Sequence, residues 1–482
     1  MNFKLVFKLT GKVLMVEGIC MLLPLLASLI YREDVLPFLA CIPVLLIVGF
    51  ALSRLKPSEH LYAREGFFAV GFIWLILALF GALPFYLSGD FPSYIDCFFE
   101  AASGFTTTGA TILTAVEGLP HGILFWRSFT HWLGGMGVLV LAIALMPSLG
   151  SRTLHLMKAE SPGPVVSKLV PKTSQSSKIL YGIYCALTVL MVICLKIAGM
   201  PLFDSIVNSF ATAGTGGFAI LNTSIGGYGN PAFEIIITVF MLLFSVNFTL
   251  YFLLLCGKWK QVLKNDELRF FAGMVVAATA LITINLVTAP TPLFSGFGEA
   301  LRHAAFQVAT IVSTTGFSST NFDLWPEFSR FLLVTLTFVG ACAGSTGGGL
   351  KCSRILLLLR SIRREIRQTI HPRSVNVIRL EGHSVEEDTV RSVLVYFAIF
   401  VVILLCVSLL ISLDGFSFSV NFTAALTCLN NVGPGVDLVG PMGNFAAFSG
   451  LSKIVLSLAM ITGRLELLPI LVLFSKNAWK RT

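Results

Sequence analysis

Long apolar stretches alternate with short polar ones along almost the whole chain. The first two apolar stretches lie near residues 13–31 and 35–53. Because an α-helix needs about 20 apolar residues to cross roughly 30 Å of hydrocarbon, both are predicted to span a membrane. Lys4, Lys8 and Lys12 precede the first stretch, but no small-residue cleavage site follows it. A retained span is therefore predicted rather than a signal peptide.

After these two spans the pattern settles into a repeated order. A long apolar span is followed by a shorter, semi-polar stretch that ends in glycine and threonine, and then by another long span. Four copies are found, at 67–88, 93–111 and 123–147; 179–200, 203–219 and 232–257; 270–289, 297–318 and 328–361; and 390–413, 416–435 and 447–475. Internal repetition of this kind is common in transport proteins.

The predicted fold is an all-α integral membrane protein in which four pseudo-repeats of helix, pore loop and helix surround a central pore. Two further transmembrane helices precede the repeats. The predicted segments are 1–66 for these two helices, 67–178 for repeat 1, 179–269 for repeat 2, 270–389 for repeat 3 with a broken second helix, and 390–482 for repeat 4.

Composition and charge support a membrane protein. Of the 482 residues, 55% are hydrophobic and 12% charged, and the mean hydropathy is +0.85, whereas soluble domains carry roughly 25% charged residues. Lysine and arginine are absent from the alternate connections 85–122, 201–230 and 414–450. The positive-inside rule then places both termini in the cytoplasm. The net charge of +9 is thus a topology feature and does not indicate nucleic acid.

A few basic residues fall on or near the opposite side, where they snorkel or pair with acidic groups: Arg32, Lys196, Arg302, Arg330 and Lys453. The ten cysteines are scattered through apolar spans without metal-binding spacing. They predict neither a disulfide framework nor a zinc site.

The four short stretches carry the candidate chemistry. Each is too short to span the membrane and ends in a turn around glycine, and irregular backbone at membrane depth must be buried in protein or line a water-filled cavity. Carbonyl and hydroxyl oxygens around one axis can replace the water of a dehydrated cation. The turns contain no carboxylate, which favours a monovalent cation over a divalent one. The candidate ion-binding residues are Thr107, Thr108, Gly109, Thr215, Gly216, Gly217, Thr314, Thr315, Gly316, Asn431, Val432 and Gly433.

Gly/Ser/Thr packing motifs between membrane helices are the alternative to a filter. One such turn would not decide between the two, but four in register on one side favour the pore. In the second turn Gly216 and Gly217 are both possible filter residues. Gly217 is chosen because it aligns Asp204 with Asp96.

The turn sequences F-T-T-T-G-A-T, T-G-G-F, S-T-T-G-F-S and N-N-V-G-P-G resemble the four filters of the Trk/Ktr/HKT superfamily of potassium transporters. The resemblance covers nearly the whole chain, and the two extra N-terminal spans point to its bacterial TrkH/TrkG branch. Glycine in all four filters implies a preference for potassium, since plant relatives with serine in the first filter tend to favour sodium.

The run from Gly340 to Gly349 interrupts an apolar span with five glycines, which should break the helix. It resembles the family's intramembrane gating loop; a tight helix crossing is the alternative. The candidate gating residues are Gly344, Ser345, Thr346, Gly347, Gly348, Gly349, Lys351 and Arg464.

Arg464 lies within the last span, where an arginine is costly and usually faces a cavity or a partner. The family resemblance implies a positive barrier below the filter and hydrogen bonds to loop carbonyls. Glu466 is a possible partner, and a snorkelling arginine is the alternative. His131 is interpreted as a packing residue rather than a ligand.

The leading hypothesis is channel-like potassium uptake, driven by membrane potential and gated by the loop. A proton- or sodium-coupled symporter is the alternative, with Glu100 and Asp96 as its candidate ionisable groups. A membrane enzyme is not supported, because no metal cluster or Ser/His/Asp constellation is apparent. The resemblance implies a homodimer in the bacterial plasma (inner) membrane that binds a cytosolic, nucleotide-binding RCK-type ring. The basic segments 152–178 and 351–379 are candidate docking surfaces for this ring, and plain lipid-facing charge is the alternative. We expect contacts with membrane lipids and no nucleic acid. No nucleotide motif is found, and no covalent cofactor is expected, only potassium ions in the filter.

Overall fold

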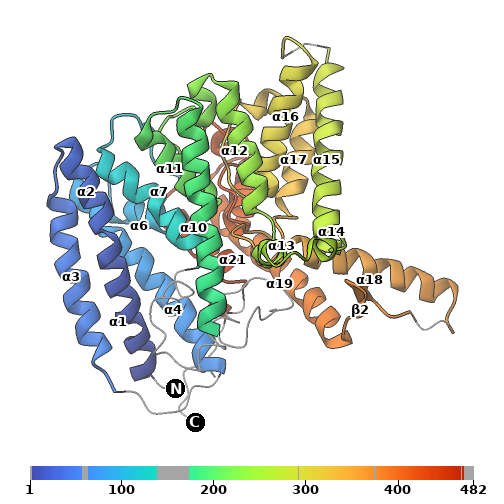
Figure 1. Cartoon of the computed structure of the whole chain (residues 1–482), viewed down its shortest axis with the longest axis horizontal. Coiled ribbons are helices and arrows are strands. Elements are labelled where there is room, and N and C mark those ends of the chain that lie inside the picture. The colour runs from blue at the N-terminus through green and yellow to red at the C-terminus, as the bar shows by residue number, and fades with distance from the viewer. Residues whose placement is uncertain are drawn as a thin grey trace.

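The structure, a computed structural model, is almost entirely helical in the part of the chain that it describes (Figure 1). The described residues are 3–56, 63–137, 173–290, 293–373, 376–467 and 469–471. The single sheet within them is a hairpin of two short strands, β1 (Arg379–Leu380) and β2 (His383–Ser384). Six helices in these ranges are long and apolar enough to cross a membrane. The predicted helical, multi-pass membrane fold is confirmed.

The N-terminal helices pack side by side at one edge of the molecule (Figure 1). Helices α1 (Phe3–Cys20) and α2 (Leu22–Tyr31) form one apolar span, and α3 (Leu36–Ser53) forms the next. A Cβ on Gly11 of α1 would lie 2.6 Å from the carbonyl oxygen of Gly49 of α3, and a Cβ on Gly49 would lie 2.7 Å from that of Gly11. Small residues at the crossing therefore let the two backbones touch.

Each repeat contains a long first helix, a short pore helix and a second helix. The first helices are α4 (Ala63–Gly81) with α5 (Leu83–Ser88), α10 (Thr173–Ile197), α15 (Asp266–Val287) and α19 (Glu387–Ile411). The pore helices are α6 (Tyr94–Phe105), α11 (Leu202–Ala213), α16 (Phe297–Val312) and α20 (Phe418–Leu429). The second helices are α7 (His121–Gly135), α12 (Pro231–Phe244), α17 (Glu327–Thr337) and α21 (Gly450–Arg464). Short 3₁₀ turns are η2 (Ser224–Tyr228), η3 (Phe322–Leu324), η4 (Ser412–Asp414) and η5 (Asp437–Val439).

The second helices differ from the prediction that only repeat 3 has a broken one. In repeat 2, α12 ends at Phe244 and α13 (Phe248–Leu255) continues at an angle of 90°. Asn247 caps α13 by accepting a hydrogen bond from the N–H of Thr249, and the N–H of Phe248 donates to the carbonyl of Gly344. The break is stabilised by a capping side chain and by a distant loop, which is why the apolar pattern alone did not indicate it. The predicted continuations over 138–147 and 472–475 lie outside the described residues.

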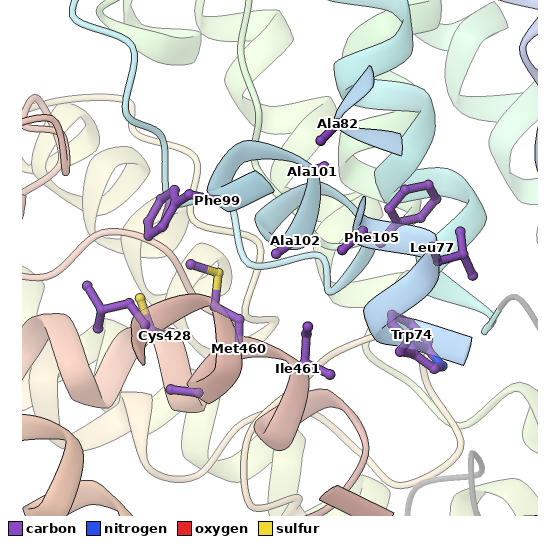
Figure 2. Packing of buried hydrophobic residues seen from close by; sticks show 14 of the residues in the cluster. Trp74, Leu77, Ala82, Phe99, Ala101, Ala102, Phe105, Cys428, Met460 and Ile461 are labelled. Atoms are coloured by element: carbon purple, nitrogen blue, oxygen red, sulfur yellow. The ribbon is translucent and has the colours of Figure 1, made fainter. Parts of the chain in front are cut away.

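Repeats 1 and 4 meet through a tightly packed apolar contact (Figure 2). Phe99, Ala102 and Phe105 of α6 lie between α4 on one side and α20 and α21 on the other, where Cys428, Met460 and Ile461 approach them (Figure 2). All six side chains are buried. This contact brings the first and last repeats together and closes the four units around one axis.

A separate group of elements lies beside the N-terminal end of α15. Helix α18 (Cys352–Ile370) leaves the body of the molecule sideways, and the hairpin lies next to it (Figure 1). The short helix α14 (Trp259–Leu263) precedes α15 at the same level. Leu357 of α18 packs with Ile378 beside the hairpin and with Val390 of α19. These elements therefore form one small unit attached below the third repeat.

Candidate functional site

The four pore helices end in the same turn. In each turn, the backbone N–H of the second residue after the helix C-cap donates a hydrogen bond to the carbonyl five residues earlier. These four bonds are 2.8 to 2.9 Å long and run from Thr108 to Ser103, Gly216 to Ala211, Thr315 to Thr310, and Val432 to Thr427. The preceding residue is left-handed in every repeat, with φ of 55° at Thr107, Thr215 and Asn431 and 60° at Thr314. Non-glycine residues adopt this conformation only where the surrounding fold imposes it. The four turns are thus one backbone design built four times.

The glycine after each turn lies against the backbone of the next repeat. A Cβ on Gly109 would lie 2.0 Å from the carbonyl oxygen of Gly216, and one on Gly217 would lie 2.0 Å from that of Thr315. The series continues from Gly316 to the carbonyl of Val432 at 2.2 Å and from Gly433 to that of Thr108 at 2.6 Å. The contacts run from repeat 1 through 2, 3 and 4 and back to 1, forming a closed ring. Because Cβ atoms do not approach other atoms this closely, only glycine fits the four positions.

Gly217 rather than Gly216 occupies the ring position in repeat 2. Its φ of 79° matches the 80°, 84° and 92° of Gly109, Gly316 and Gly433. A Cβ on Gly216 would instead lie 2.2 Å from the ring of His131. The backbone geometry therefore gives the same register as the alignment of Asp204 with Asp96.

A cavity of about 110 Å³ opens above this ring, and all four ring glycines line it. Its other lining groups include Thr111, Asn222, Asn444 and the charged Arg127, but no carboxylate among the described residues. The turns that meet in this ring follow directly after the carboxyl ends of the four pore helices. Helix carboxyl ends carry partial negative charge, so they favour a cation beneath the ring.

An ion pair that the sequence reasoning missed supports the first two turns from behind. Arg127 Nε lies 2.6 Å from Glu100 Oε1, and both side chains are buried. The other carboxylate oxygen of Glu100 accepts the N–H of Ile112, just past the first turn. Arg127 also donates to the carbonyl of Ala219 and covers the ring of Phe218 at 3.8 Å, both just past the second turn. The sequence feature that could have indicated this pair is an arginine in an apolar segment that follows a pore-helix glutamate, because an arginine at membrane depth usually has a partner.

Charged pairs also join the other neighbouring repeats. Arg302 of α16 pairs with Glu234 of α12 at 2.8 Å, Arg330 of α17 with Asp437 of repeat 4 at 3.3 Å, and Lys453 of α21 with Asp96 of α6 at 2.6 Å. Three of the five basic residues predicted to snorkel or pair therefore bind carboxylates of an adjacent repeat. With the contacts of Arg127 to Phe218 and Ala219, each of the four repeat boundaries has at least one contact that involves a charged side chain.

The segment between α17 and α18 lies directly beneath the ring. The N–H of Gly348 donates to Oγ1 of Thr314 at 2.6 Å, and a Cβ on Gly348 would lie 2.5 Å from the carbonyl oxygen of Asn430. Thr346 Oγ1 donates to the carbonyl of Phe244 at 3.1 Å. Lys351 donates from its ammonium to the carbonyl of Gly347. The predicted loop residues thus contact the undersides of repeats 3 and 4 and the broken second helix of repeat 2.

Arg464, the last residue of α21 in repeat 4, binds this loop. Its guanidinium donates to the carbonyl of Thr346 at 2.8 Å and to those of Gly134 and Gly135 at 2.6 Å. Glu466 pairs instead with Arg354 of α18, at 2.5 Å, so the suggested Arg464–Glu466 pair is wrong. Residues two apart on a helix do not face each other, and Glu466 lies beyond the end of α21 with φ of 58°.

His131 is a packing residue, held by two hydrogen bonds. Its Nδ1 lies 2.7 Å from the carbonyl of Gly104, and its Nε2 accepts the N–H of Phe218 at 3.3 Å. A ring that donates at Nδ1 and accepts at Nε2 is neutral, with both nitrogens occupied. The described residues contain no group of three or more His, Cys, Asp or Glu side chains that could hold a metal ion.

The chain is similar to known proteins over its whole length. A family model, TrkH, described as a cation transport protein, matches residues 38–481. The Trk system potassium uptake protein TrkH of Salmonella typhimurium is 38% identical over 487 residues and covers 100% of both chains. TrkG of Escherichia coli, also a Trk system potassium uptake protein, is 31% identical and covers 99% of both. The crystal structure of the potassium transporter TrkH from Vibrio parahaemolyticus matches with a TM-score of 0.89 and 33% identity, over 100% of both chains.

Proposed function

Because the chain belongs to the TrkH family of cation transport proteins, we propose that it takes up potassium through the ring of four glycine turns. Transport is channel-like and driven by the membrane potential. The filter consists of Thr107–Gly109, Thr215–Gly217, Thr314–Gly316 and Asn431–Gly433, whose carbonyl and side-chain oxygens replace water around the ion. The protein is a bacterial inner-membrane protein with both termini in the cytoplasm.

The observation that carries this proposal is the closed ring of glycine-to-carbonyl contacts. The four carbonyls named in these contacts come from the residues immediately before the ring glycines, one from each repeat. Rings of backbone carbonyls are how potassium channels coordinate a dehydrated ion. The cavity above the ring has no carboxylate among its described lining residues, and its one charged lining side chain, Arg127, is paired with Glu100. A site without carboxylates suits a monovalent cation better than a divalent one.

The loop beneath the ring supports a gate. With its hydrogen bonds to Thr314 and Arg464 it occupies the position below the filter, so it must move before an ion passes. The charge of Arg464 adds an electrostatic barrier to cations there. We propose that a cytosolic RCK-type nucleotide-binding ring moves the loop, and that the transporter works as a homodimer.

Coupled symport is the weaker alternative. It requires a group in the pathway that exchanges protons or a second ion. The two candidates, Glu100 and Asp96, are each held in a short ion pair, with Arg127 and Lys453. Such pairing favours a structural role for both carboxylates over one as mobile proton carriers.

The experiment compares potassium and sodium flux in liposomes for the wild-type protein, Gly109→Ser and the control Gly182→Ser. A Cβ at Gly109 meets a carbonyl at 2.0 Å, whereas one at Gly182 of α10 meets nothing within 4 Å. Gly109→Ser should lower the potassium-to-sodium permeability ratio by about tenfold or more, equivalent to roughly 1.4 kcal/mol, while Gly182→Ser keeps it. An unchanged ratio in Gly109→Ser would overturn the filter assignment. A reversal potential that follows a proton or sodium gradient at fixed potassium would overturn passive transport.

A further inference from the structure

One carboxylate holds both ends of the loop beneath the ring. Oε1 of Glu267 accepts the backbone N–H of Ala343 at 2.7 Å and that of Ser353 at 2.9 Å. Ala343 lies before the glycines at residues 344–349, and Ser353 lies in the first turn of α18 after them. This single side-chain atom therefore holds both ends of the loop, next to the backbone bond from the N–H of Cys352 to the carbonyl of Ala341 at 3.0 Å.

Glu267 is suited to this role by its position and burial. It lies in the first turn of α15, a membrane-spanning helix of repeat 3, and its side chain is 7% exposed. Two donors that converge on one buried oxygen require an acceptor with free lone pairs, which a carboxylate provides most strongly. Among the described residues, no other side chain accepts a hydrogen bond from either of these two N–H groups.

The two residues before Glu267 bind the unit formed by α18 and the hairpin. Asp266 pairs with Arg360 of α18 at 2.9 Å and accepts the N–H of Glu381 in the hairpin turn at 3.1 Å. Asn265, the N-cap of α15, donates from its amide to the carboxylate of Glu381. Three consecutive residues thus connect the base of the loop with α18 and with a hairpin that lies outside the membrane-spanning helices.

We propose that Glu267 is the positioning residue that keeps the loop closed under the filter, and that residues 265–267 couple the loop to the α18–hairpin unit. A displacement of α18 or the hairpin would pull on Asp266 and Asn265 and strain the two hydrogen bonds of Glu267. Release of Ala343 and Ser353 would then loosen the base of the loop, leaving the backbone bond between Cys352 and Ala341 as its remaining closure. This inference rests on the proposed gating function of the loop.

The reactivity of native cysteines measures how far the base of the loop has opened. Cys342 and Cys352 adjoin the two anchored residues and are buried, and Cys428 in pore helix α20 is equally buried but distant from the anchor. Alkylation of the full-length protein in liposomes, followed by peptide mass spectrometry, measures the exposure of each thiol. Global loosening would expose all three thiols, whereas opening of the loop base would expose Cys342 and Cys352 alone.

The variants are Glu267→Ala, the conservative Glu267→Gln, and Glu299→Ala as a control. The carboxylate of Glu299 accepts hydrogen bonds from Ser295, away from the loop. Glu267→Ala should speed alkylation of Cys342 and Cys352 by at least about fivefold, the lower end of typical coupling between sites, and raise basal potassium flux with unchanged selectivity. Glu267→Gln retains an acceptor oxygen and should restore most of the protection. Arg360→Gln should also speed the alkylation of Cys342 and Cys352.

The outcomes separate this inference from the proposed function. Unchanged alkylation of Cys342 and Cys352 in Glu267→Ala, or an equal rise at Cys428, would overturn the anchoring role. No effect of Arg360→Gln would overturn the coupling to α18. Faster alkylation of Cys342 and Cys352 without higher flux would support the anchor but show that the loop is not the gate.

Discussion

The side-chain amide of Asn431 in the fourth turn donates a hydrogen bond to Oγ1 of Thr108 in the first, at 3.0 Å. The same nitrogen also donates to the carbonyl of Met460 in α21, at 2.9 Å. The two residues are 323 positions apart in the sequence. This contact therefore joins the end of the chain to its first repeat at the level of the filter.

Asn431→Ala should weaken the closure of the ring. The substitution removes both hydrogen bonds and places alanine at φ of 55°, a conformation that asparagine tolerates better. We expect a loss of about 1–2 kcal/mol in stability, from the bonds and the backbone together, and a lower potassium-to-sodium ratio. Thermal unfolding in detergent and liposome flux measure the two effects. Selectivity equal to that of the wild type would show that this side chain does not shape the filter.

Arg464→Ala should raise basal potassium flux. It removes three hydrogen bonds to the carbonyls of Thr346, Gly134 and Gly135, and with them a positive charge beneath the filter. A hydrogen bond to a charged group contributes about 1.5–3 kcal/mol, so the closed loop should lose at least about tenfold in relative population.

Arg464→Lys separates the two contributions of that residue. Lysine keeps the charge but lacks the planar fork that reaches several carbonyls at once. Intermediate flux indicates that both charge and tethering contribute, and flux as high as in Arg464→Ala assigns the effect to tethering. If neither variant passes more potassium than the wild type, Arg464 does not restrain the gate.

Breaking the Lys453–Asp96 pair should destabilise the boundary between repeats 4 and 1. The side chains are 11% and 8% exposed, so Lys453→Met or Asp96→Asn leaves an unpaired buried charge or an unmatched partner. Removing one partner of such a pair typically costs about 3–5 kcal/mol, while replacing both costs much less. A double-mutant cycle on detergent-solubilised protein measures the difference. Glu327→Gln is the control, because that carboxylate is 87% exposed in its pair with Arg330 and should cost no more than about 1 kcal/mol. Additive losses in the double variant would contradict this prediction.

The contact between α2–α3 and α7 should make stability depend on pH in the acidic range. Glu33, between α2 and α3, lies 2.7 Å from His121 Nδ1 and accepts the N–H of Gly122 at 3.2 Å. Burial raises the pKa of Glu33, but the bonds to His121 and Gly122 more than offset this and lower the pKa below its usual value.

A lowered folded pKa fixes the sign of this dependence. The contribution of Glu33 is fully present above the unfolded pKa of about 4.3 and is lost as the pH falls through the lower folded value. Glu33→Gln should therefore reduce the melting temperature at neutral pH and flatten its decline between about pH 5 and pH 3. Asp90→Asn, at an exposed carboxylate after α5, should leave the profile as in the wild type. An identical acid profile in Glu33→Gln would refute the assignment.

The positions of the four turns were predictable because their determinants are local. A short amphipathic helix followed by threonine and glycine specifies its own ending, and the same left-handed residue and glycine recur in each copy. The break before α18 was predictable for the same reason, since glycines disfavour a helix wherever they lie. The break between α12 and α13 was not, because Phe244 to Asn247 contains no glycine or proline and its geometry depends on the carbonyl of Gly344.

The sequence by itself determined that this chain spans a membrane, repeats one unit four times and places a glycine turn in each, because hydropathy, length and glycine content act within a segment. Only the tertiary structure decided which groups meet across repeats. In the folded protein Arg127 pairs with Glu100, and Glu466 pairs with Arg354 and not with Arg464. Glu267 lies at the base of the loop. Charged side chains at membrane depth must find partners, but several partners are available to each, and only the packing of the helices selects one.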